Sequence, residues 1–418
     1  MNAVILTVGD EILIGQITNT NAAWLGERLG LAGVTVARME TVGDDEPAIR
    51  RALGRALEEA ELVVVTGGLG PTHDDVTVSA VAEGFGRAVA FRPELMEEVE
   101  AKFAARGLVP LAAHRAFAEV PEGFEVLPNP KGMAPGLWGA RDDGRLVAVL
   151  PGVPYEMKAI VEDHVLPRLR DRVDGGVVLH KTLLTVGEGE TALAERLGAL
   201  SDGLGEGVTL AFLPGLGMVR LRLTVRGSDR VAAQAQLDAG ADRLRHALGD
   251  LVFGEDDETL EGVVGEGLAA RGLTLAVAES CTGGAVAARL TSAPGASRYF
   301  VGGIVAYDNA VKRDALGVEA ATLQAHGAVS EPVARQLAAG ARAALGTDLA
   351  VATTGVAGPT GGTPEKPVGT VWLGYADAAG THAVRLRFTP DRAVNIALST
   401  TAALNLLRRQ LLRRDRQG

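Results

Sequence analysis

Short apolar runs alternate with longer amphipathic segments along the first 170 residues. The apolar runs Ala3–Val8 and Leu62–Thr66 are typical of buried strands, and Val34–Val42 is predicted to be the strand between them. Between them, residues 21–30 and 47–60 have the spacing of helices, and Pro47 stands in the first turn of the second one. Strands and helices that alternate at this spacing predict a doubly wound parallel sheet.

The same alternation returns after residue 252. Strand-like runs at Leu273–Ala278, Gly302–Tyr307 and Leu349–Thr354 are separated by helical segments, and two more strands and a long helix follow them. This segment is therefore predicted to be a second α/β domain with helices between its strands.

Residues 171–252 have a different pattern. Met218–Val225 alternates strictly between apolar and polar residues, so one face of this strand is predicted to be exposed to solvent. We therefore predict two three-layer α/β/α domains, residues 1–170 and 253–418, joined by a small α+β domain over residues 171–252.

Composition narrows the class of protein. The 418 residues are 47% hydrophobic and only 4% aromatic, which suits helices packed on buried parallel strands. The net charge of −11, without a long basic block, argues against a dedicated nucleic-acid binder. The single cysteine, Cys281, excludes an intrachain disulfide framework. No apolar run reaches about 18 residues and no signal peptide is recognised, so we expect a cytoplasmic protein without a membrane span.

Glycines gather at the end of the third predicted strand. Gly67, Gly68 and Gly70 would let the backbone approach phosphate oxygens closely, and Thr72 belongs to the same loop. The loop lacks the GxGxxG pattern of dinucleotide-binding proteins, so a nicotinamide-dependent oxidoreductase is not favoured. Lys131, one of only six lysines among 41 basic residues, follows a later strand and is a candidate partner for a phosphate.

Acidic residues follow predicted strands at the same edge of the sheet. Such a cluster beside a phosphate-binding loop suits Mg²⁺ or a similar hard cation that bridges carboxylates and phosphate. Helix capping by Asp44, Asp74 or Asp75 is the alternative, and Glu156 is also placed to start a helix. The candidate metal ligands are Asp10, Asp44, Asp75 and Glu156.

Ser280 stands at a corner where a strand turns into a helix. A serine nucleophile needs a base, and no histidine follows a strand in this domain, so a Ser-His-Asp triad is not favoured. Tyr307 and Lys312 follow the next strand. A partly desolvated Lys312 would be neutral and would accept the serine proton directly or through the Tyr307 hydroxyl. Helix capping by Ser280 is the alternative.

Three neighbours of Ser280 are candidates for an oxyanion hole. The backbone N–H groups of Thr282, Gly283 and Gly284 would point at a developing negative charge. Cys281 is the rival nucleophile. It ranks below Ser280 because cysteine is commonly buried and no imidazole is placed to form its thiolate.

The glycine- and proline-rich segment 355–369 follows the third strand of this domain. It would hold a substrate phosphate with Arg392, at the start of a helix, as its partner. A solvent-exposed loop without a ligand is the alternative.

Several motifs closely resemble the C-terminal domain of the CinA family, which is named for competence and damage inducibility. The resemblance implies a nicotinamide mononucleotide amidohydrolase that releases ammonia, leaves nicotinic acid mononucleotide and needs no cofactor for this step. It implies that Ser280, Tyr307 and Lys312 form the catalytic set. The segments that carry the resemblance are Ala278–Gly284, Tyr307–Lys312, His326–Glu331, Gly355–Pro359 and Lys366–Thr370. The candidate substrate-binding residues of this site are Thr282, Gly283, Gly284, Asn309, Thr354, Gly355, Gly358 and Arg392.

The N-terminal motifs Gly9–Leu13 and Gly67–Asp75 resemble the molybdopterin-binding fold of molybdenum-cofactor enzymes. In full-length CinA proteins this domain is associated with ADP-ribose pyrophosphatase activity, which implies a divalent metal (Mg, Co or Mn). The middle segment corresponds to a KH-like domain of the family. It shows no basic GxxG clamp, so RNA binding is not expected.

The sequence therefore predicts a pyridine-nucleotide salvage enzyme with two hydrolytic sites. One acts on nicotinamide mononucleotide, and the other cleaves ADP-ribose to AMP and ribose 5-phosphate. We expect a homodimer. The alternative is a regulatory protein that binds a nucleotide or a pterin without turnover.

Overall fold

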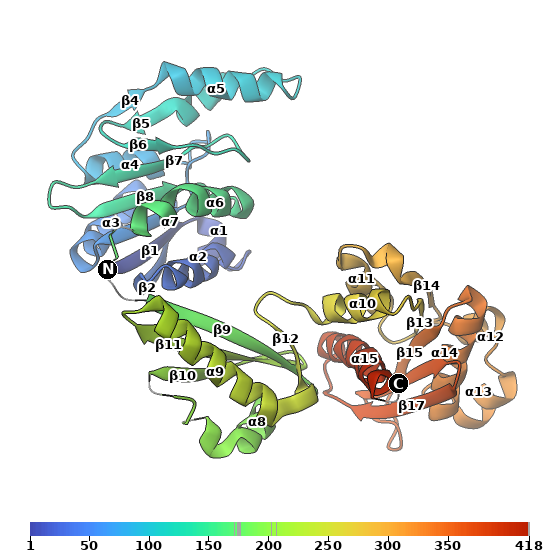
Figure 1. Cartoon of the computed structure of the whole chain (residues 1–418). Coiled ribbons are helices and arrows are strands. Elements are labelled where there is room, and N and C mark those ends of the chain that lie inside the picture. Colours follow the sequence, from blue (N-terminus) through green and yellow to red (C-terminus); the bar gives the residue numbers. More distant parts are fainter. Residues whose placement is uncertain (171, 174–176, 202, 206, 417–418) are drawn as a thin grey trace. The chain divides into compact units, whose positions relative to one another are not determined.

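The computed structural model describes residues 1–170, 172–173, 177–201, 203–205 and 207–416. These residues form two compact units, one of residues 1–179 with 225–234 and one of residues 180–224 with 235–418. Figure 1 gives the order of the helices and strands along the chain. The predicted boundary between residues 170 and 171 lies partly outside the described residues, because residue 171 is not among them.

A six-stranded sheet forms the centre of the N-terminal domain (Figure 1). Its order is β2-β1-β3-β8-β7-β6; the first four strands are parallel, and β7 and β6 are antiparallel to their neighbours. This confirms the predicted parallel sheet. The strands are β1 (Asn2–Val8), β2 (Thr35–Val42), β3 (Leu62–Thr66), β6 (Glu125–Leu127), β7 (Gly136–Ala140) and β8 (Leu146–Leu150). A separate antiparallel pair consists of β4 (Val89–Phe91) and β5 (Glu119–Pro121).

Helices cover both faces of this sheet, which gives the predicted three layers. Alternate residues of β1 point to opposite faces, so Val4 belongs to a core cluster with residues of α3 and α4, whereas Ile5 belongs to one with residues of α2 and α6. The helices are α1 (Asp10–Leu13), α2 (Thr20–Leu31), α3 (Glu46–Glu59), α4 (Thr77–Gly84), α5 (Pro93–Ala104), α6 (Pro154–Ile160) and α7 (Leu166–Arg170), with a 3-10 helix at Ala112–Ala118 and a π-helical turn at Val161–Val165.

The middle segment is a four-stranded sheet with two helices. The strand order is β10-β11-β9-β12. The elements are β9 (Val177–Val186), α8 (Glu190–Leu197), β10 (Val208–Gly215), β11 (Met218–Gly227), α9 (Arg230–Leu248) and β12 (Val252–Glu255). Along β11, Val219, Leu221 and Leu223 are buried and the arginines between them are exposed, as the alternating pattern predicts.

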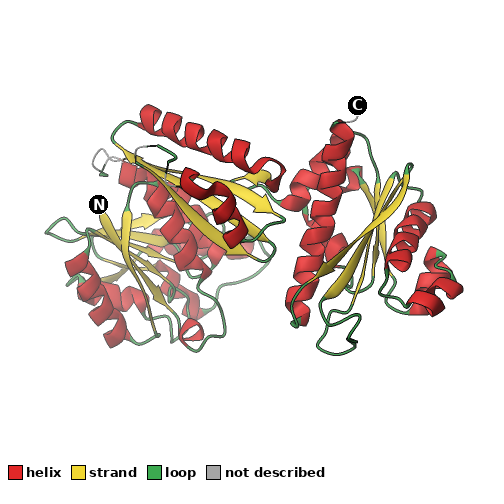
Figure 2. Ribbon diagram, turned by 90° about the horizontal axis from the view of Figure 1, so that it is seen from below, coloured by secondary structure: helices red, strands yellow, loops and turns green. Residues whose placement is uncertain are grey.

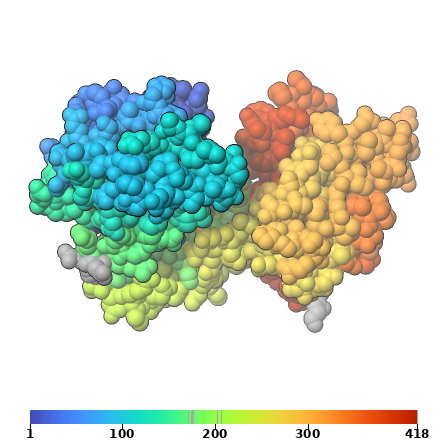
Figure 3. Space-filling view, turned by 90° about the horizontal axis from the view of Figure 1, so that it is seen from above, coloured from blue at the N-terminus to red at the C-terminus, as the bar shows by residue number. Residues whose placement is uncertain are grey.

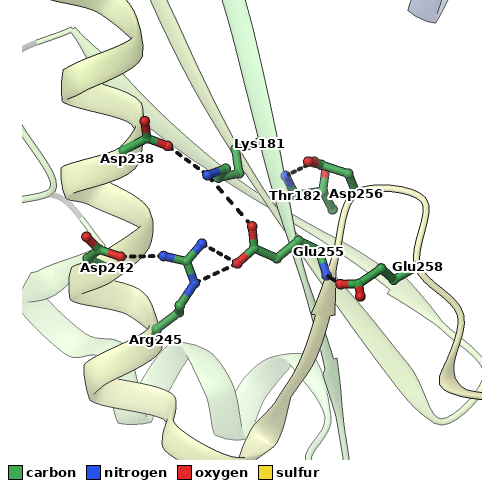
Figure 4. A network of polar contacts seen from close by, with 8 residues as sticks. All are labelled: Lys181, Thr182, Asp238, Asp242, Arg245, Glu255, Asp256 and Glu258. Carbon is green, nitrogen blue, oxygen red and sulfur yellow. Dashed lines mark hydrogen bonds and ion pairs between the residues drawn. The ribbon is translucent and has the colours of Figure 1, made fainter. Parts of the chain in front are cut away.

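A network of charged side chains links α9 to β9 and β12 (Figure 4). Lys181 donates a hydrogen bond to Asp238 at 2.7 Å, and its ammonium lies 3.7 Å from Glu255. Arg245 pairs with both Glu255 and Asp242. Lys181, one of the few lysines of the chain, therefore has a structural role in this network.

A five-stranded sheet of order β14-β13-β15-β16-β17 forms the C-terminal domain, in which β14, β13 and β15 are parallel. Helices α10, α11 and α15 pack on one face and α12 and α14 on the other (Figure 2). The segment with α12 and α13 lies at the surface, in orange in Figure 3. The elements are α10 (Leu260–Ala270), β13 (Leu275–Glu279), α11 (Ala285–Ser292), β14 (Phe300–Val305), α12 (Asn309–Leu316), α13 (Ala320–His326), α14 (Glu331–Leu345), β15 (Leu349–Gly355), β16 (Thr370–Asp377), β17 (Gly380–Arg387) and α15 (Arg392–Asp415).

Within the described part of the chain, none of the helices combines the length and the hydropathy that crossing a membrane requires.

Candidate functional site

Ser280 directly follows β13, which has a parallel neighbour on each side. Glu279, the last residue of β13, pairs with Val305 of β14 and with Thr353 of β15. The N–H of Ser280 donates to the carbonyl of Thr353 at 3.0 Å, and the N–H of Ala306 donates to the carbonyl of Glu279 at 2.8 Å. Because the three parallel strands end at the same level, the residues that follow them share one edge of the sheet.

Lys312 is brought to this edge by α12, whose start follows β14. Its side chain is buried, with 1% of the residue exposed, and its ammonium donates to the main-chain carbonyl of Tyr307 at 2.7 Å. Burial lowers the pKa of Lys312, and the nearby charge of Asp308 only partly opposes this effect. A buried lysine with a lowered pKa has a larger neutral fraction, and the neutral amine is the form that accepts a proton.

The hydroxyl of Tyr307 contacts Arg392. The guanidinium of Arg392 donates to this hydroxyl at 3.0 Å and to the carbonyl of Gly358 at 2.9 Å. The Tyr307 side chain is 60% exposed. Arg392 therefore connects the end of β14, the loop at residues 355–369 and the start of α15.

Glu279 is a functional candidate that the sequence reasoning missed. Only 1% of this residue is exposed, and its carboxylate accepts hydrogen bonds from the hydroxyl of Thr282 and from three backbone N–H groups. These N–H groups belong to Gly284, Val286 and Ala287, at 2.8 to 3.0 Å. The carboxylate of Glu279 thus accepts the hydrogen bonds of N–H groups that have no partner within α11. Glu279 lies five residues before Gly284, which is outside the usual positions of a helix cap.

These contacts correct the predicted oxyanion site. The N–H of Gly284 is directed to the carboxylate at the end of β13, and the N–H of Gly283 donates to the carbonyl of Ser280 at 3.2 Å. Both glycines have positive φ, 62° and 106°, so their role is to form the sharp turn. The N–H groups of Cys281 and Thr282, which donate to no main-chain carbonyl among the described residues, are the better candidates.

The other predicted binding residues of this domain have mixed roles. Asn309 is the first residue of α12. The buried Thr354 donates its hydroxyl hydrogen to the carbonyl of Ala328 at 2.8 Å, so this residue also has a structural contact. Gly355 is tightly packed, since a Cβ atom there would lie 2.8 Å from a methyl group of Val371.

The loop that carries Gly358 is held in place by Asn395, another residue that the sequence reasoning missed. The buried side-chain amide of Asn395 donates to the carbonyls of Ala357 and Thr389, both at 2.8 Å. These bonds connect the loop to α15, so the loop is anchored at the point where Arg392 contacts it.

Cys281 is expected to resist alkylation in the folded protein. Burial raises the pKa of its thiol to about 12, a shift that a hydrogen bond with Thr353 only partly opposes. We expect iodoacetamide at about pH 8 to leave Cys281 unmodified in the native chain and to label it fully in guanidinium chloride, as mass spectrometry would show. Equal labelling rates in the two states would contradict the buried, protonated thiol.

Glu279→Ala is expected to destabilise the segment around α11. Four donors would lose their acceptor, which corresponds to a loss of about 2–4 kcal/mol in unfolding free energy. Hydrogen exchange of peptides from residues 275–292, measured across a guanidinium chloride series, would report this loss. The matched control is Glu266→Ala at an exposed position of α10, for which we expect at most about 0.5 kcal/mol. Equal effects of the two substitutions would refute the capping role.

A cavity of about 660 Å³ lies at the carboxyl ends of β1 and β3 in the N-terminal domain. Two of its glycines are required sterically: a Cβ atom would lie 2.1 Å from the carbonyl of Val8 at Gly67 and 2.2 Å from the Thr77 hydroxyl at Gly68. The predicted residues that line the cavity are Gly67, Gly68, Gly70, Asp44, Asp75, Lys131 and Glu156. Thr72 and Asp10 are not among the lining residues.

Asp44 and Asp75 are acidic groups of this cavity. Burial raises the pKa of Asp44, and the negative charges of Asp10, Glu11 and Asp75 add to the shift although the N–H of Asp10 donates to its carboxylate. Capping is not the role of Asp44, because Asp45 caps α3. The negative charges around Asp44 repel one another, and a bound cation would relieve this repulsion.

The predicted set of four metal ligands is not preassembled. Among the described residues, no three His, Cys, Asp or Glu side chains are grouped closely enough to hold a metal ion. Asp10 opens α1 outside the cavity lining. Glu156 is buried and accepts a hydrogen bond from Asn129 at 2.6 Å, so it anchors the neighbouring loop. Asp44 and Asp75 therefore fit a cation only if a ligand phosphate supplies further oxygens.

Comparisons with known proteins show the family of this chain. The chain is 52% identical to a CinA-like protein of Salinibacter ruber, over 98% of this chain and the full length of that protein. The chain belongs to the CinA family. Another CinA-like protein, from Gemmatimonas aurantiaca, is 45% identical over 99% of this chain and 97% of its own length.

Three family models match this CinA-family chain one after another. They are the probable molybdopterin binding domain at residues 4–171, the damage-inducible protein CinA KH domain at residues 180–254 and the CinA C-terminal domain at residues 257–411. Among solved structures, a CinA protein of unknown function from Thermoplasma acidophilum is 38% identical, covers 41% of this chain and 97% of its own, and has a TM-score of 0.37.

Proposed function

We propose that the C-terminal domain of this CinA-family protein hydrolyses nicotinamide mononucleotide to nicotinic acid mononucleotide and ammonia. The observation that carries the proposal is the buried Lys312, with its lowered pKa, at the same sheet edge as Ser280. The buried thiol of Cys281 leaves the serine as the better nucleophile. Release of ammonia from nicotinamide mononucleotide tests the proposal, and a rate no higher than the enzyme-free blank contradicts it.

The reaction would proceed through an ester of Ser280. The serine oxygen attacks the amide carbon of the substrate, and its proton passes to the neutral Lys312. The backbone N–H groups of Cys281 and Thr282 stabilise the oxyanion. When the carbon–nitrogen bond breaks, the proton on Lys312 goes to the leaving nitrogen and ammonia departs. Water then hydrolyses the ester, with Lys312 accepting its proton and returning it to the serine oxygen.

The contacts of Tyr307 favour direct proton transfer over a relay through its hydroxyl. That hydroxyl is bonded to Arg392, whereas Lys312 is bonded to the main-chain carbonyl of the tyrosine. In this proposal Tyr307 and Arg392 bind the nucleotide, and the phosphate contacts Arg392 beside Gly358.

For the N-terminal domain we propose hydrolysis of ADP-ribose to AMP and ribose 5-phosphate. The glycine loop at Gly67–Gly70 and Lys131, which line one cavity, support phosphate binding. Asp44 and Asp75 would hold a divalent metal (Mg, Co or Mn) together with phosphate oxygens. When bound, such a metal supplies charge neutralisation and an activated water. A homodimer and a cytoplasmic location stay predictions.

A metal chelator separates the two proposed activities. We expect EDTA to abolish ADP-ribose hydrolysis, because Asp44 and Asp75 would lose the cation that compensates their charge, and excess Mg²⁺ or Mn²⁺ to restore it. Deamidation by the same sample serves as the control and is expected to be unchanged. Chromatography of AMP and nicotinic acid mononucleotide measures both reactions. Hydrolysis of ADP-ribose that persists in EDTA would disprove the role of the metal. Binding without product would favour a regulatory protein.

A further inference from the structure

Asn21 contributes a hydrogen-bond acceptor without a partner to the N-terminal cavity. The residue lies in the first turn of α2, lines the cavity and is only 9% exposed. Its side-chain nitrogen donates to the carbonyl of Gly152 at 2.7 Å. No group in the described part of the chain donates to its side-chain oxygen.

The orientation of the Asn21 amide is fixed by this geometry. A flip would bring the amide oxygen against the carbonyl of Gly152, and two acceptors repel each other. A buried acceptor without a donor costs about 1–3 kcal/mol. Since the chain itself does not satisfy the oxygen, a donor from a bound molecule is the natural partner.

Some of the neutral polar side chains that line the cavity with Asn21 already have partners within the chain. Asn19 donates to the hydroxyl of Thr7 at 3.0 Å, and the hydroxyl of Thr66 donates to the carbonyl of Pro151 at 3.1 Å. Asn19, Thr7 and Thr66 all line the same cavity. The amide oxygen of Asn21 is a neutral acceptor, which suits a hydroxyl donor better than a cation.

The position of Asn21 indicates which part of a bound ligand would lie close to it. Gly152, to which Asn21 is bonded, packs against the start of the glycine loop, and a Cβ atom on Gly152 would lie 3.4 Å from the Cα atom of Gly67. With a phosphate on the loop at Gly67–Gly70, the sugar joined to that phosphate is the next group along the ligand. A nucleobase is several bonds more distant.

We propose that Asn21 is a specificity-determining residue that accepts a hydrogen bond from a ribose hydroxyl of the phosphorylated ligand. The inference rests on the proposed hydrolysis of ADP-ribose in this cavity. It assigns the site to ribosyl phosphates and predicts rejection of their deoxy analogues, because a missing hydroxyl leaves a buried acceptor unpaired.

The test compares ligands with and without a given hydroxyl, each measured on the wild-type chain and on a variant of Asn21. The probes are ribose 5-phosphate with its 2-deoxy analogue, and AMP with its 2′-deoxy and 3′-deoxy analogues. Affinities come from inhibition of ADP-ribose hydrolysis and from calorimetry. We expect the wild-type chain to prefer the hydroxylated member of at least one pair by about tenfold or more, and Asn21→Leu to bind both members of that pair equally.

Each outcome has one interpretation. A purely structural role of Asn21 would weaken both members of a pair alike and leave their ratio unchanged, which overturns the inference. A wild-type chain that hydrolyses ADP-ribose but does not discriminate within any pair also overturns it, while the proposed function stands. A chain that neither binds nor hydrolyses ADP-ribose removes the proposed function as well. If Asn21→Leu does not fold, as thermal melting would show, Asn21→Ser replaces it, because its hydroxyl is too short to reach the ligand.

Discussion

Ser280→Ala is expected to reduce ammonia release from nicotinamide mononucleotide by at least about 10³-fold. In the proposed mechanism the substitution removes the atom of the chain that would bond to the substrate carbon, so no ester would form, whereas the binding contacts and the proposed oxyanion N–H groups would stay. The side chain of Ser280 stands after the central parallel strand, and the backbone contact with Thr353 does not depend on its hydroxyl. The fold should therefore be retained, and steady-state ammonia assays would measure the loss.

The matched control for this experiment is the neighbouring residue. Cys281→Ala removes the buried thiol, whose pKa of about 12 keeps it protonated, and should keep deamidation within about tenfold of the wild type. ADP-ribose hydrolysis should be unchanged in both variants. Activity that survives in Ser280→Ala and disappears in Cys281→Ala would assign the nucleophile to the cysteine.

Lys312→Met is expected to lower deamidation by about 10²–10⁴-fold. The variant keeps a long apolar side chain in a position that is 1% exposed, and it removes the amine that would take the serine proton in the proposed mechanism. Lys312→Arg should be equally inactive, because an arginine is not deprotonated in proteins. An active Lys312→Arg variant would show that positive charge at this position, rather than proton transfer, supports the reaction.

The wild-type rate should depend on pH through Lys312. Burial lowers its pKa from the ordinary value of 10.5, so the neutral base becomes populated at lower pH than for an exposed lysine. The value of kcat/KM should rise as pH increases through the lowered pKa of Lys312 and should reach its plateau below pH 10.5. A profile that falls with increasing pH over this range would require a protonated Lys312 and contradict its role as a base.

The sequence predicted the parallel sheets because their central strands are buried on both faces and form plain apolar runs, such as Leu62–Thr66. It also placed Ser280 and Lys312 at one edge, since the carboxyl ends of parallel strands coincide. It did not predict which backbone amides are free near Ser280. That depends on where a single side chain, Glu279, directs its two oxygens.

Contacts between residues far apart in the chain explain the other omissions. Asn21 begins the predicted helix at residues 21–30 and had no predicted function, but its side chain bonds to the carbonyl of Gly152, 131 residues further along the chain. Glu156 was predicted as a metal ligand; it lines the cavity, and its buried carboxylate accepts a hydrogen bond from Asn129, a contact that the sequence did not predict. Local patterns locate such residues at the sheet edge, and tertiary contacts decide which of them face a ligand.

Interception of the proposed ester by hydroxylamine tests the central claim most directly. If Ser280 carries the acyl group, hydroxylamine added to the reaction should divert part of the product to the hydroxamate of nicotinic acid mononucleotide, and Ser280→Ala should form none. Mass spectrometry distinguishes the hydroxamate from the free acid. Full ammonia release with only the free acid as product, at every hydroxylamine concentration, would show that water attacks the amide directly and would contradict the account.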